Sequence, residues 1–88
     1  MSGSTSTQQF PGEFPIKVMG RHDSDLRALT LAIVERHAGP LAESKVRTRT
    51  SADGNFLALT YLVNATSREQ LDHIYRELTA CKSVLMAL

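Results

Sequence analysis

Hydrophobic residues recur along the chain with two different spacings, which together predict six secondary-structure elements. In four segments an apolar residue occupies every second position, as expected for strands with one buried side. In two longer segments the apolar residues lie three and four positions apart, which indicates amphipathic helices. The predicted strands are residues 14–19, 44–51, 55–64 and 83–88, and the predicted helices are residues 25–39 and 66–81.

Residues that favour helix ends stand at the boundaries of both helical segments. Asp23 and Ser24 are both good N-cap residues for the first helix. Gly39 can adopt the positive φ that often ends a helix, and the proline after it forbids continuation. Thr66 and Glu69 match a capping box at the start of the second helix. Each predicted helix therefore has a chemical reason to begin where its apolar repeat begins.

The order of the elements predicts an α+β, ferredoxin-like sandwich. Asp53 and Gly54 tolerate positive φ and predict a hairpin between the second and third strands. Two right-handed crossovers and this hairpin give a βαββαβ chain, with a four-stranded antiparallel sheet in the order 4-1-3-2 and two helices on one face. We expect residues 13–88 to form this single domain. Residues 1–12 are rich in Ser, Thr and Gln, and we expect a disordered tail there.

Composition narrows the class of protein without naming a function. The chain has 88 residues and a net charge of +1, so no bulk field attracts it to nucleic acid or to an anionic membrane. It has one cysteine, Cys81, which excludes an internal disulfide and a Cys-rich zinc site. No apolar run approaches the roughly 20 residues of a membrane span, and the amino terminus lacks the features of a secretory signal. We expect a cytoplasmic protein.

Four segments resemble the YbeD-like family of small uncharacterised bacterial proteins. They read "FPIKVMG", "ERHAGP", "GNFLALTYLVNAT" and "VLMAL". The resemblance implies a ferredoxin-like fold similar to that of ACT domains, which sense small molecules in amino-acid metabolism. It also implies a regulatory or interaction role without catalysis, and it supplies no catalytic residue to transfer.

Strand alternation sorts the side chains onto two faces of the predicted sheet. The core side of the sheet is predicted to hold Ile16, Val18, Val46, Leu57, Leu59, Tyr61, Val63, Val84, Met86 and Leu88. The helix residues predicted to face it are Leu26, Leu29, Ile33, Leu71, Ile74 and Leu78. The opposite face is predicted to hold Lys17, Met19, Lys45, Arg47, Arg49, Phe56, Ala58, Thr60, Leu62, Leu85 and Ala87.

The centre of this opposite face is apolar and its edge strand is basic. Each apolar side chain left on an open sheet forgoes on the order of 1 kcal/mol of burial. The face is either a tolerated mixed surface, a contact with another protein or a second copy of the chain, or a small-molecule pocket formed at such a contact. We favour the protein contact. The candidate interaction surface comprises Lys17, Met19, Lys45, Arg47, Arg49, Phe56, Ala58, Leu62 and Leu85.

The segment between the first strand and the first helix is a weaker candidate. It lacks the glycine spacing of a nucleotide-binding loop, and its aspartates would repel a phosphate. If the likeness to ACT domains extends to ligand binding, Gly20, Arg21 and Asp23 would lie near a small-molecule effector. We favour a hinge that ends the strand at Gly20, followed by a helix cap.

The sequence shows no catalytic or metal-binding constellation. His22, His37 and His73 are not at ligand spacing, and Cys81 falls on the apolar stripe of the second helix, where it is expected to be a small buried hydrophobe. We therefore expect no enzyme and no cofactor.

Weak RNA binding is the alternative function, because RNA-recognition modules share this fold. They need aromatic platforms on the first and third strands, and only Phe56 is available on the open face. Lys45, Arg47 and Arg49 could contact phosphates, but a basic edge strand also discourages unwanted sheet pairing. We consider nucleic acid the less favoured partner.

Overall fold

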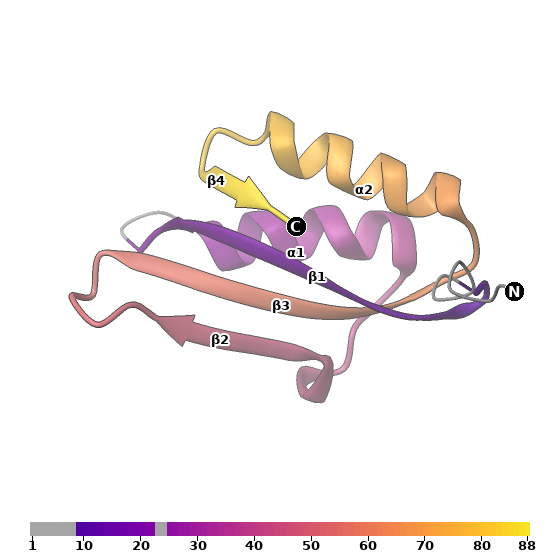
Figure 1. Cartoon of the computed structure of the whole chain (residues 1–88), viewed down its shortest axis with the longest axis horizontal. Helices are drawn as coiled ribbons and strands as arrows, with labels where there is room; N and C mark the ends of the chain where they lie inside the picture. The colour runs from indigo at the N-terminus through magenta and orange to yellow at the C-terminus, as the bar shows by residue number, and fades with distance from the viewer. Residues whose placement is uncertain (1–8, 23–24) are drawn as a thin grey trace, which may run out of the picture.

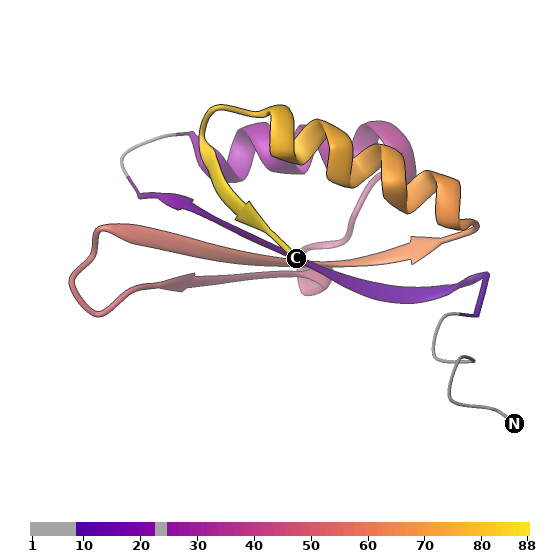
Figure 2. The ribbon, with the colours of Figure 1, turned by 45° about the horizontal axis from the view of Figure 1, so that its top comes forward.

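The computed structural model describes residues 9–22 and 25–88. Its elements are β1 (Gly12–Arg21), α1 (Leu26–Ala38), the short 3-10 helix η2 (Glu43–Lys45), β2 (Val46–Thr50), β3 (Phe56–Ala65), α2 (Arg68–Ala80) and β4 (Val84–Ala87). The strands form one antiparallel sheet in the order β2-β3-β1-β4, which confirms the predicted ferredoxin-like topology (Figure 1). Figure 2 shows both helices on the same side of the sheet, so its other side, the open face, is left uncovered.

The core lies between the helices and the sheet, and β3 contributes more buried residues to it than any other element. Every second residue of β3 is buried, as the alternation predicts. The buried apolar residues of the sheet are Ile16, Val18, Leu57, Leu59, Tyr61, Val63 and Ala65, and those of the helices are Leu26, Ile33, Val34, Leu71, Ile74 and Leu78. Val46 and Val84 pack against this core but are only half-buried, because each lies near the end of an edge strand.

The prediction for α1 was wrong at one position. Leu29 is 44% exposed, whereas Thr30 and Val34 are buried. At 100° per residue, the stripe through Leu26, Ile33 and the buried Thr30 turns Leu29 away from the sheet. Thr30 therefore occupies the helix–sheet contact that was predicted for Leu29, and its hydrogen bond with Tyr61 accounts for this.

Thr30 and Tyr61 form a buried hydrogen-bonded pair across the core. The Thr30 hydroxyl donates to the Leu26 carbonyl oxygen at 2.7 Å and lies 2.6 Å from the Tyr61 hydroxyl oxygen. The Tyr61 hydroxyl also donates a longer bond, 3.4 Å, to the Arg27 carbonyl oxygen. Burial of Tyr61 raises the pKa of its phenol above the ordinary value of 10.0. This pair joins the central strand β3 to α1 through polar groups that are satisfied inside the core.

A β-bulge interrupts the pairing of β4 with β1 and corrects the predicted faces of β4. Met19 pairs with Met86, but the next residue of β1, Gly20, pairs with Val84, so Leu85 is the extra residue. Val84 and Ala87 therefore pack against the core, while Met86 and Leu88 are 50% and 67% exposed. The prediction had placed Met86 and Leu88 in the core and Ala87 on the open face. It was wrong because an uninterrupted alternation cannot cross a bulge.

Gly20 lies inside β1, which runs to Arg21, so the predicted end of the strand at Gly20 was wrong. Gly20 is buried and pairs with Leu57 on one side and Val84 on the other. A Cβ atom at this position would overlap the Ser83 carbonyl oxygen and lie 2.8 Å from Leu26 Cδ1. Glycine is required here because α1 and the chain entering β4 both approach the strand closely.

Asp53 and Gly54 form the turn of the β2–β3 hairpin, as predicted. Gly54 has a φ of 80°, which favours glycine. Asp53 accepts hydrogen bonds from the Asn55 backbone N–H at 3.0 Å and from the Ser51 hydroxyl at 2.7 Å, and these bonds lower the pKa of its carboxyl group. His22, the residue after β1, joins the same turn through a 2.9 Å bond from its backbone N–H to the Asn55 carbonyl oxygen.

The helix caps differ in detail from the prediction. The N-cap of α2 is Ser67, whose hydroxyl accepts a hydrogen bond from the Gln70 backbone N–H at 3.1 Å, so the box predicted at Thr66 and Glu69 is displaced by one residue. The Gln70 side chain accepts from the Thr66 backbone N–H at 2.7 Å. For α1, the predicted caps Asp23 and Ser24 lie outside the described residues. Asp25 occupies the N-cap position without a side-chain hydrogen bond.

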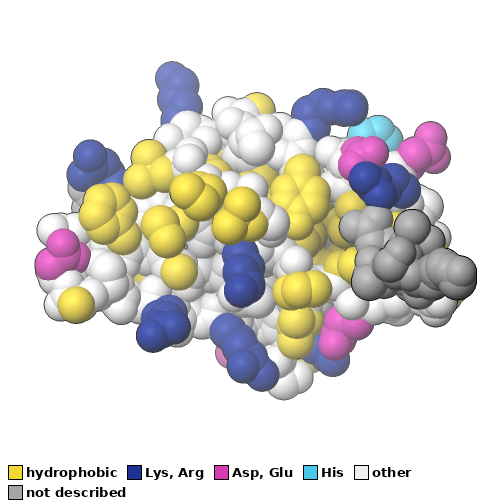
Figure 3. Space-filling view, viewed as in Figure 1, with side chains coloured by type: hydrophobic (Ala, Val, Ile, Leu, Met, Phe, Trp, Pro, Cys, Tyr) yellow, Lys and Arg dark blue, Asp and Glu magenta, His cyan; other side chains and the backbone are white. Residues whose placement is uncertain are grey.

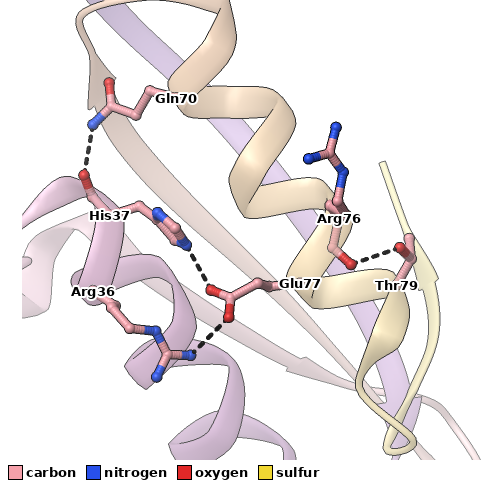
Figure 4. Close-up of polar contacts among 6 residues, drawn as sticks. All are labelled: Arg36, His37, Gln70, Arg76, Glu77 and Thr79. Atoms are coloured by element: carbon pink, nitrogen blue, oxygen red, sulfur yellow. Dashed lines mark hydrogen bonds and ion pairs between the residues drawn. The ribbon is translucent and has the colours of Figure 1, made fainter.

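Polar side chains join the two helices at the carboxyl end of α1 (Figure 4). Glu77 of α2 contacts His37 Nε2 at 2.6 Å and Arg36 at 3.4 Å. Gln70 donates to the His37 carbonyl oxygen at 2.8 Å, which satisfies one of the terminal carbonyl groups of α1. The contacts fix the angle between helices whose apolar sides share the same core.

Glu77 is expected to make folding stability depend on acidic pH. Its hydrogen bond with His37 lowers the pKa of the carboxyl group below the ordinary value of 4.5, with a further contribution from Arg36. Since the folded-state pKa is depressed, the stabilisation is present above about pH 4.5 and is lost as the pH falls through the folded value. Glu77→Gln should therefore lower the melting temperature at pH 7 but have a smaller effect at pH 3. Glu69→Gln, on an exposed residue of the same helix, is the control, and an equal effect of Glu77→Gln at both pH values would contradict the linkage.

The folded part of the chain begins within the segment that the sequence assigns to the tail. Residues 1–8 lie outside the described residues. Gly12 is the first residue of β1, and Phe10 packs half-buried against the core with its ring stacked on that of Phe14 at 5.0 Å. Contacts of the domain therefore extend amino-terminally to at least Phe10.

Candidate interaction surface

Two rows of side chains cross the open face at the middle of the sheet. Strand pairing places Arg47 opposite Thr60, Thr60 opposite Lys17, and Lys17 beside Leu88, which exchanges two backbone hydrogen bonds with it at 2.9 and 2.7 Å. The neighbouring row is Arg49, Ala58, Met19 and Met86. All eight residues lie on the same side, because they occupy alternate positions of each strand.

These two rows enclose a groove, and its shape follows from side-chain size. Ala58 and Thr60, in the third strand, are short, whereas their neighbours in β2 and β1 are long. The resulting hollow has a volume of about 470 Å³, and we call it the sheet groove. Its principal lining side chains are Lys17, Met19, Arg47, Arg49, Ala58, Thr60, Met86 and Leu88. Figure 3 shows apolar side chains gathered across the middle of this face and basic side chains along the margin formed by β2.

The groove is basic without an acidic counterpart. Of its described lining residues, three are cationic and none is acidic. No hydrogen bond or ion pair joins the side chains of Lys17, Arg47 or Arg49 to another described residue. Elsewhere cations do have partners, such as Lys45 with Glu13 at 2.6 Å and Arg36 with Glu77 at 3.4 Å. Positive charge is thus concentrated beside an apolar floor.

The structure brings five of the nine predicted surface residues together in the groove: Lys17, Met19, Arg47, Arg49 and Ala58. Phe56 lies at its end, where a smaller hollow of about 270 Å³ also involves Met19 and Arg49. Leu62 is on the open face opposite Pro15 but does not line the groove.

Two predicted surface residues occupy other places, and three groove residues were not among the nine. One of the three, Thr60, was predicted on the open face but not included in the candidate surface. Lys45 belongs to η2 and pairs with Glu13, and Leu85 is the bulge residue of β4, 57% exposed. Met86 and Leu88 were missed because the bulge exchanges the faces of β4. A glycine in a strand often marks a bulge or a close backbone approach, so Gly20 was the one signal in the sequence.

The weaker candidate, the loop after β1, is described only in part. Gly20 is buried, and Arg21 is in β1 opposite Phe56; Asp23 lies outside the described residues. His22 Nδ1 is 3.1 Å from the Gly54 carbonyl oxygen. The close packing of Ser83 and Leu26 explains the glycine at position 20, and ligand binding by this loop stays a prediction.

Residues 9–22 and 25–88 contain neither a metal-binding cluster nor a membrane-spanning helix. No group of three or more His, Cys, Asp or Glu side chains in that part of the chain is arranged to hold a metal ion. Neither α1 nor α2 is long and apolar enough to cross a membrane, and the same is true of every described helix. Cys81 packs against the core, as its place on the apolar stripe predicts, but it is only half-buried because it lies at the C-cap of α2.

A solved structure has a similar fold. The C-terminal domain of the MgtC protein from Mycobacterium tuberculosis superposes with a TM-score of 0.60 over 92% of this chain and 87% of that domain. The sequences are 15% identical, so the similarity concerns the fold alone.

Sequence relatives place the chain in a family. Proteins named UPF0250 protein include one from Chromobacterium violaceum, 49% identical over 81 residues and covering 91% of this chain and 90% of the relative. Another, from Paraburkholderia phytofirmans, is 41% identical over 87 residues, covering 99% and 98%. A family model described as "Protein of unknown function (DUF493)" matches residues 5–88. These matches confirm the resemblance to small YbeD-like bacterial proteins, and the chain belongs to the DUF493 family.

Proposed function

We propose that this chain is a non-enzymatic, cytoplasmic interaction module with a regulatory role, and that its open face binds an acidic surface of another protein. The sheet groove carries this proposal, because its three cations have no acidic partner among the described residues and surround exposed apolar side chains. In the segments outside the description, only Asp23 is acidic. A partner would have to supply the complementary charge.

The apolar part of the groove would supply much of the affinity. Met19, Met86 and Leu88 are between 41% and 67% exposed, so covering them removes apolar surface from water. Methionine adapts its shape to different partners, which suits a module that binds a protein surface. The surrounding cations would orient the partner and accelerate its approach, an effect that salt weakens.

A second copy of the chain fits this face less well than an acidic partner does. If two open faces packed about a two-fold axis that crosses the strands, β2 would lie over β2, and Lys17, Arg47 and Arg49 of one copy would lie near the same three cations of the other. Like charges in a contact that excludes water cost several kcal/mol. An axis parallel to the strands would also provide no acidic partner for these cations, because the described lining of the groove has none. Charge complementarity therefore favours a different, acidic protein.

Arg47→Glu is expected to weaken partner binding at least about tenfold, because it replaces an attraction in the groove by a repulsion. Proteins captured from native lysate by the wild-type chain would be identified, purified and titrated against each variant. Arg76→Glu is the matched control, since it makes the same charge change on an exposed residue of α2. Met86→Ser should also weaken binding, whereas Leu29→Ser, which alters an exposed apolar residue on α1, should not.

The proposal fails if every captured protein binds the Arg47→Glu and Arg76→Glu variants equally well. Direct titration tests two alternative ligands of the same groove, RNA and a small carboxylate. Binding of single-stranded oligouridylate at low salt, abolished by Arg47→Glu, would replace the protein with RNA. A rise in melting temperature with a small carboxylate, again abolished by Arg47→Glu, would indicate an ACT-like effector site instead.

A further inference from the structure

β2 is an edge strand that the rest of the described domain leaves unusually bare. It is the outermost strand on its side of the sheet, next to β3 only. Four of its five residues are exposed, including Thr48 and Thr50 on the helix side. Figure 1 shows the reason, because both helices lie over the opposite part of the sheet and do not extend across β2.

The hydrogen bonds between β2 and β3 show which backbone groups of β2 point out of the edge of the sheet. Ser51 donates its N–H to the Phe56 carbonyl oxygen at 2.9 Å, so Ser51 faces β3. In an antiparallel pair alternate residues face the partner, so Arg49 and Arg47 also face β3, whereas Thr50, Thr48 and Val46 face away.

A second pair of bonds, on the other side of the sheet, gives the same alternation. Lys17 exchanges two bonds with Leu88, so Lys17 faces β4 and its neighbour Val18 faces β3. Val18 pairs with Leu59, which therefore turns its backbone groups toward β1 and away from its other neighbour, Thr48. The backbone N–H and C=O of Thr48 are thus directed out of the sheet edge.

The side chains of β2 select what can pair with this edge. Arg47 and Arg49 project on the open face, and Thr48 projects on the other side. If two copies paired antiparallel through β2 about Thr48, Arg47 of each would lie opposite Arg49 of the other. Like charges directly opposite destabilise a strand pair, so the edge disfavours self-pairing. Acidic side chains at alternate positions of a different strand would instead meet both arginines.

We propose that β2 accepts, as a fifth strand of the sheet, an extended segment of a partner protein in which acidic residues alternate with apolar or β-branched residues. The main-chain bonds would come from the N–H and C=O groups of Thr48 and Thr50 and from the Val46 carbonyl oxygen, because the Val46 N–H already donates to the Glu43 carbonyl oxygen. The acidic side chains would lie beside Arg47 and Arg49 at the border of the sheet groove. This inference rests on the proposed function and adds the conformation and sequence pattern of the bound segment.

The probe is a short synthetic peptide in which glutamate alternates with valine, titrated into the isotope-labelled full chain at low salt. We expect the largest amide shifts at Thr48 and Thr50, whose N–H groups point out of the sheet edge. Thr48→Pro should weaken binding at least about tenfold, because it removes an outward N–H without breaking the β2–β3 ladder. Thr48→Val, which keeps the N–H, should bind within about twofold of wild type. An isomeric peptide with its glutamates grouped at one end should bind much more weakly.

Modified peptides keep the test valid if Thr48→Pro disturbs the fold. N-methylation of the peptide amides that would face β2 should abolish binding, whereas N-methylation of the alternate amides should not. Equal effects of the two methylation patterns, or equal binding by the isomeric peptide, would overturn strand addition.

The partner protein itself separates this inference from the proposed function. If its binding is lost in Arg47→Glu but unchanged in Thr48→Pro, the open face binds it without an added strand, and only the inference on β2 fails. If binding is unchanged in both variants, both proposals fail. Loss in both, with Thr48→Val unaffected, supports both.

Discussion

Gly20→Val is expected to lower the free energy of unfolding by about 3 kcal/mol, and Gly20→Ala by about 2 kcal/mol. The new Cβ would overlap the carbonyl oxygen of Ser83 and press on Leu26, and a backbone carbonyl cannot move aside as a flexible side chain can. For a domain of this size, 3 kcal/mol corresponds to a fall of roughly 12–24 °C in melting temperature. Thermal and urea unfolding measured by circular dichroism would show the effect.

Gly54→Asn is the control for this prediction. Gly54 has a positive φ and open space around it, and asparagine tolerates that conformation, so the change should cost less than about 1 kcal/mol. A melting temperature for Gly20→Ala close to that of wild type would contradict the close approach of β1, α1 and β4. If a Gly20 variant changed the binding of a small-molecule ligand without changing the stability, Gly20 would instead belong to a ligand-binding loop.

Thr30→Val is expected to destabilise the protein by about 1–3 kcal/mol although it keeps the size and shape of the side chain. The Tyr61 hydroxyl would lose its 2.6 Å partner and keep only the 3.4 Å contact with the Arg27 carbonyl oxygen. A buried hydroxyl without a good partner costs more than the hydrogen bond contributed. Adding Tyr61→Phe to Thr30→Val should recover part of the loss, because it removes the unsatisfied group.

The same pair makes stability depend on alkaline pH. Burial raises the pKa of Tyr61 above 10.0, so the stabilisation of its neutral form is present below about pH 10 and is lost as the pH rises through the folded value. Tyr61→Phe should therefore flatten the alkaline fall in melting temperature. Burial also raises the pKa of Tyr75, so part of the fall should persist. An unchanged alkaline profile would contradict the buried environment of Tyr61.

Much of the fold follows from the sequence because the strongest patterns are local and undisturbed. β3 keeps a strict alternation from Leu57 to Ala65, which identifies its buried side. Gly54 fixes the hairpin, and the spacing of Leu71, Ile74 and Leu78 fixes the face of α2. The two helices are of similar length, and each connects two strands of the same sheet. Because such crossovers are right-handed, few other topologies are compatible with this order of elements.

The features that the sequence did not reveal depend on contacts between distant residues. The position of the bulge in β4 is decided by where β1 and β4 meet, and so by the space around Gly20. In α1, Thr30 rather than Leu29 faces the core because its hydroxyl bonds to that of Tyr61, 31 positions away in the chain. The side chains of β1, β2 and β3 were therefore assigned to the correct faces of the sheet, while those at the end of β4 were not.

The extra residue at the bulge also has a genetic consequence. Deleting the codon for Leu85 would restore an unbroken alternation in the terminal strand without changing any other amino acid. The remaining residues would keep their present partners in an unbroken ladder, with Val84 opposite Gly20, Met86 opposite Met19 and Leu88 still bonded to Lys17, so the side chains now numbered Met86 and Leu88 would stay on the open face. A one-codon deletion here should thus be far better tolerated than a one-codon deletion within β3, whose alternation has no bulge, and mutational scans that include deletions would reveal this contrast.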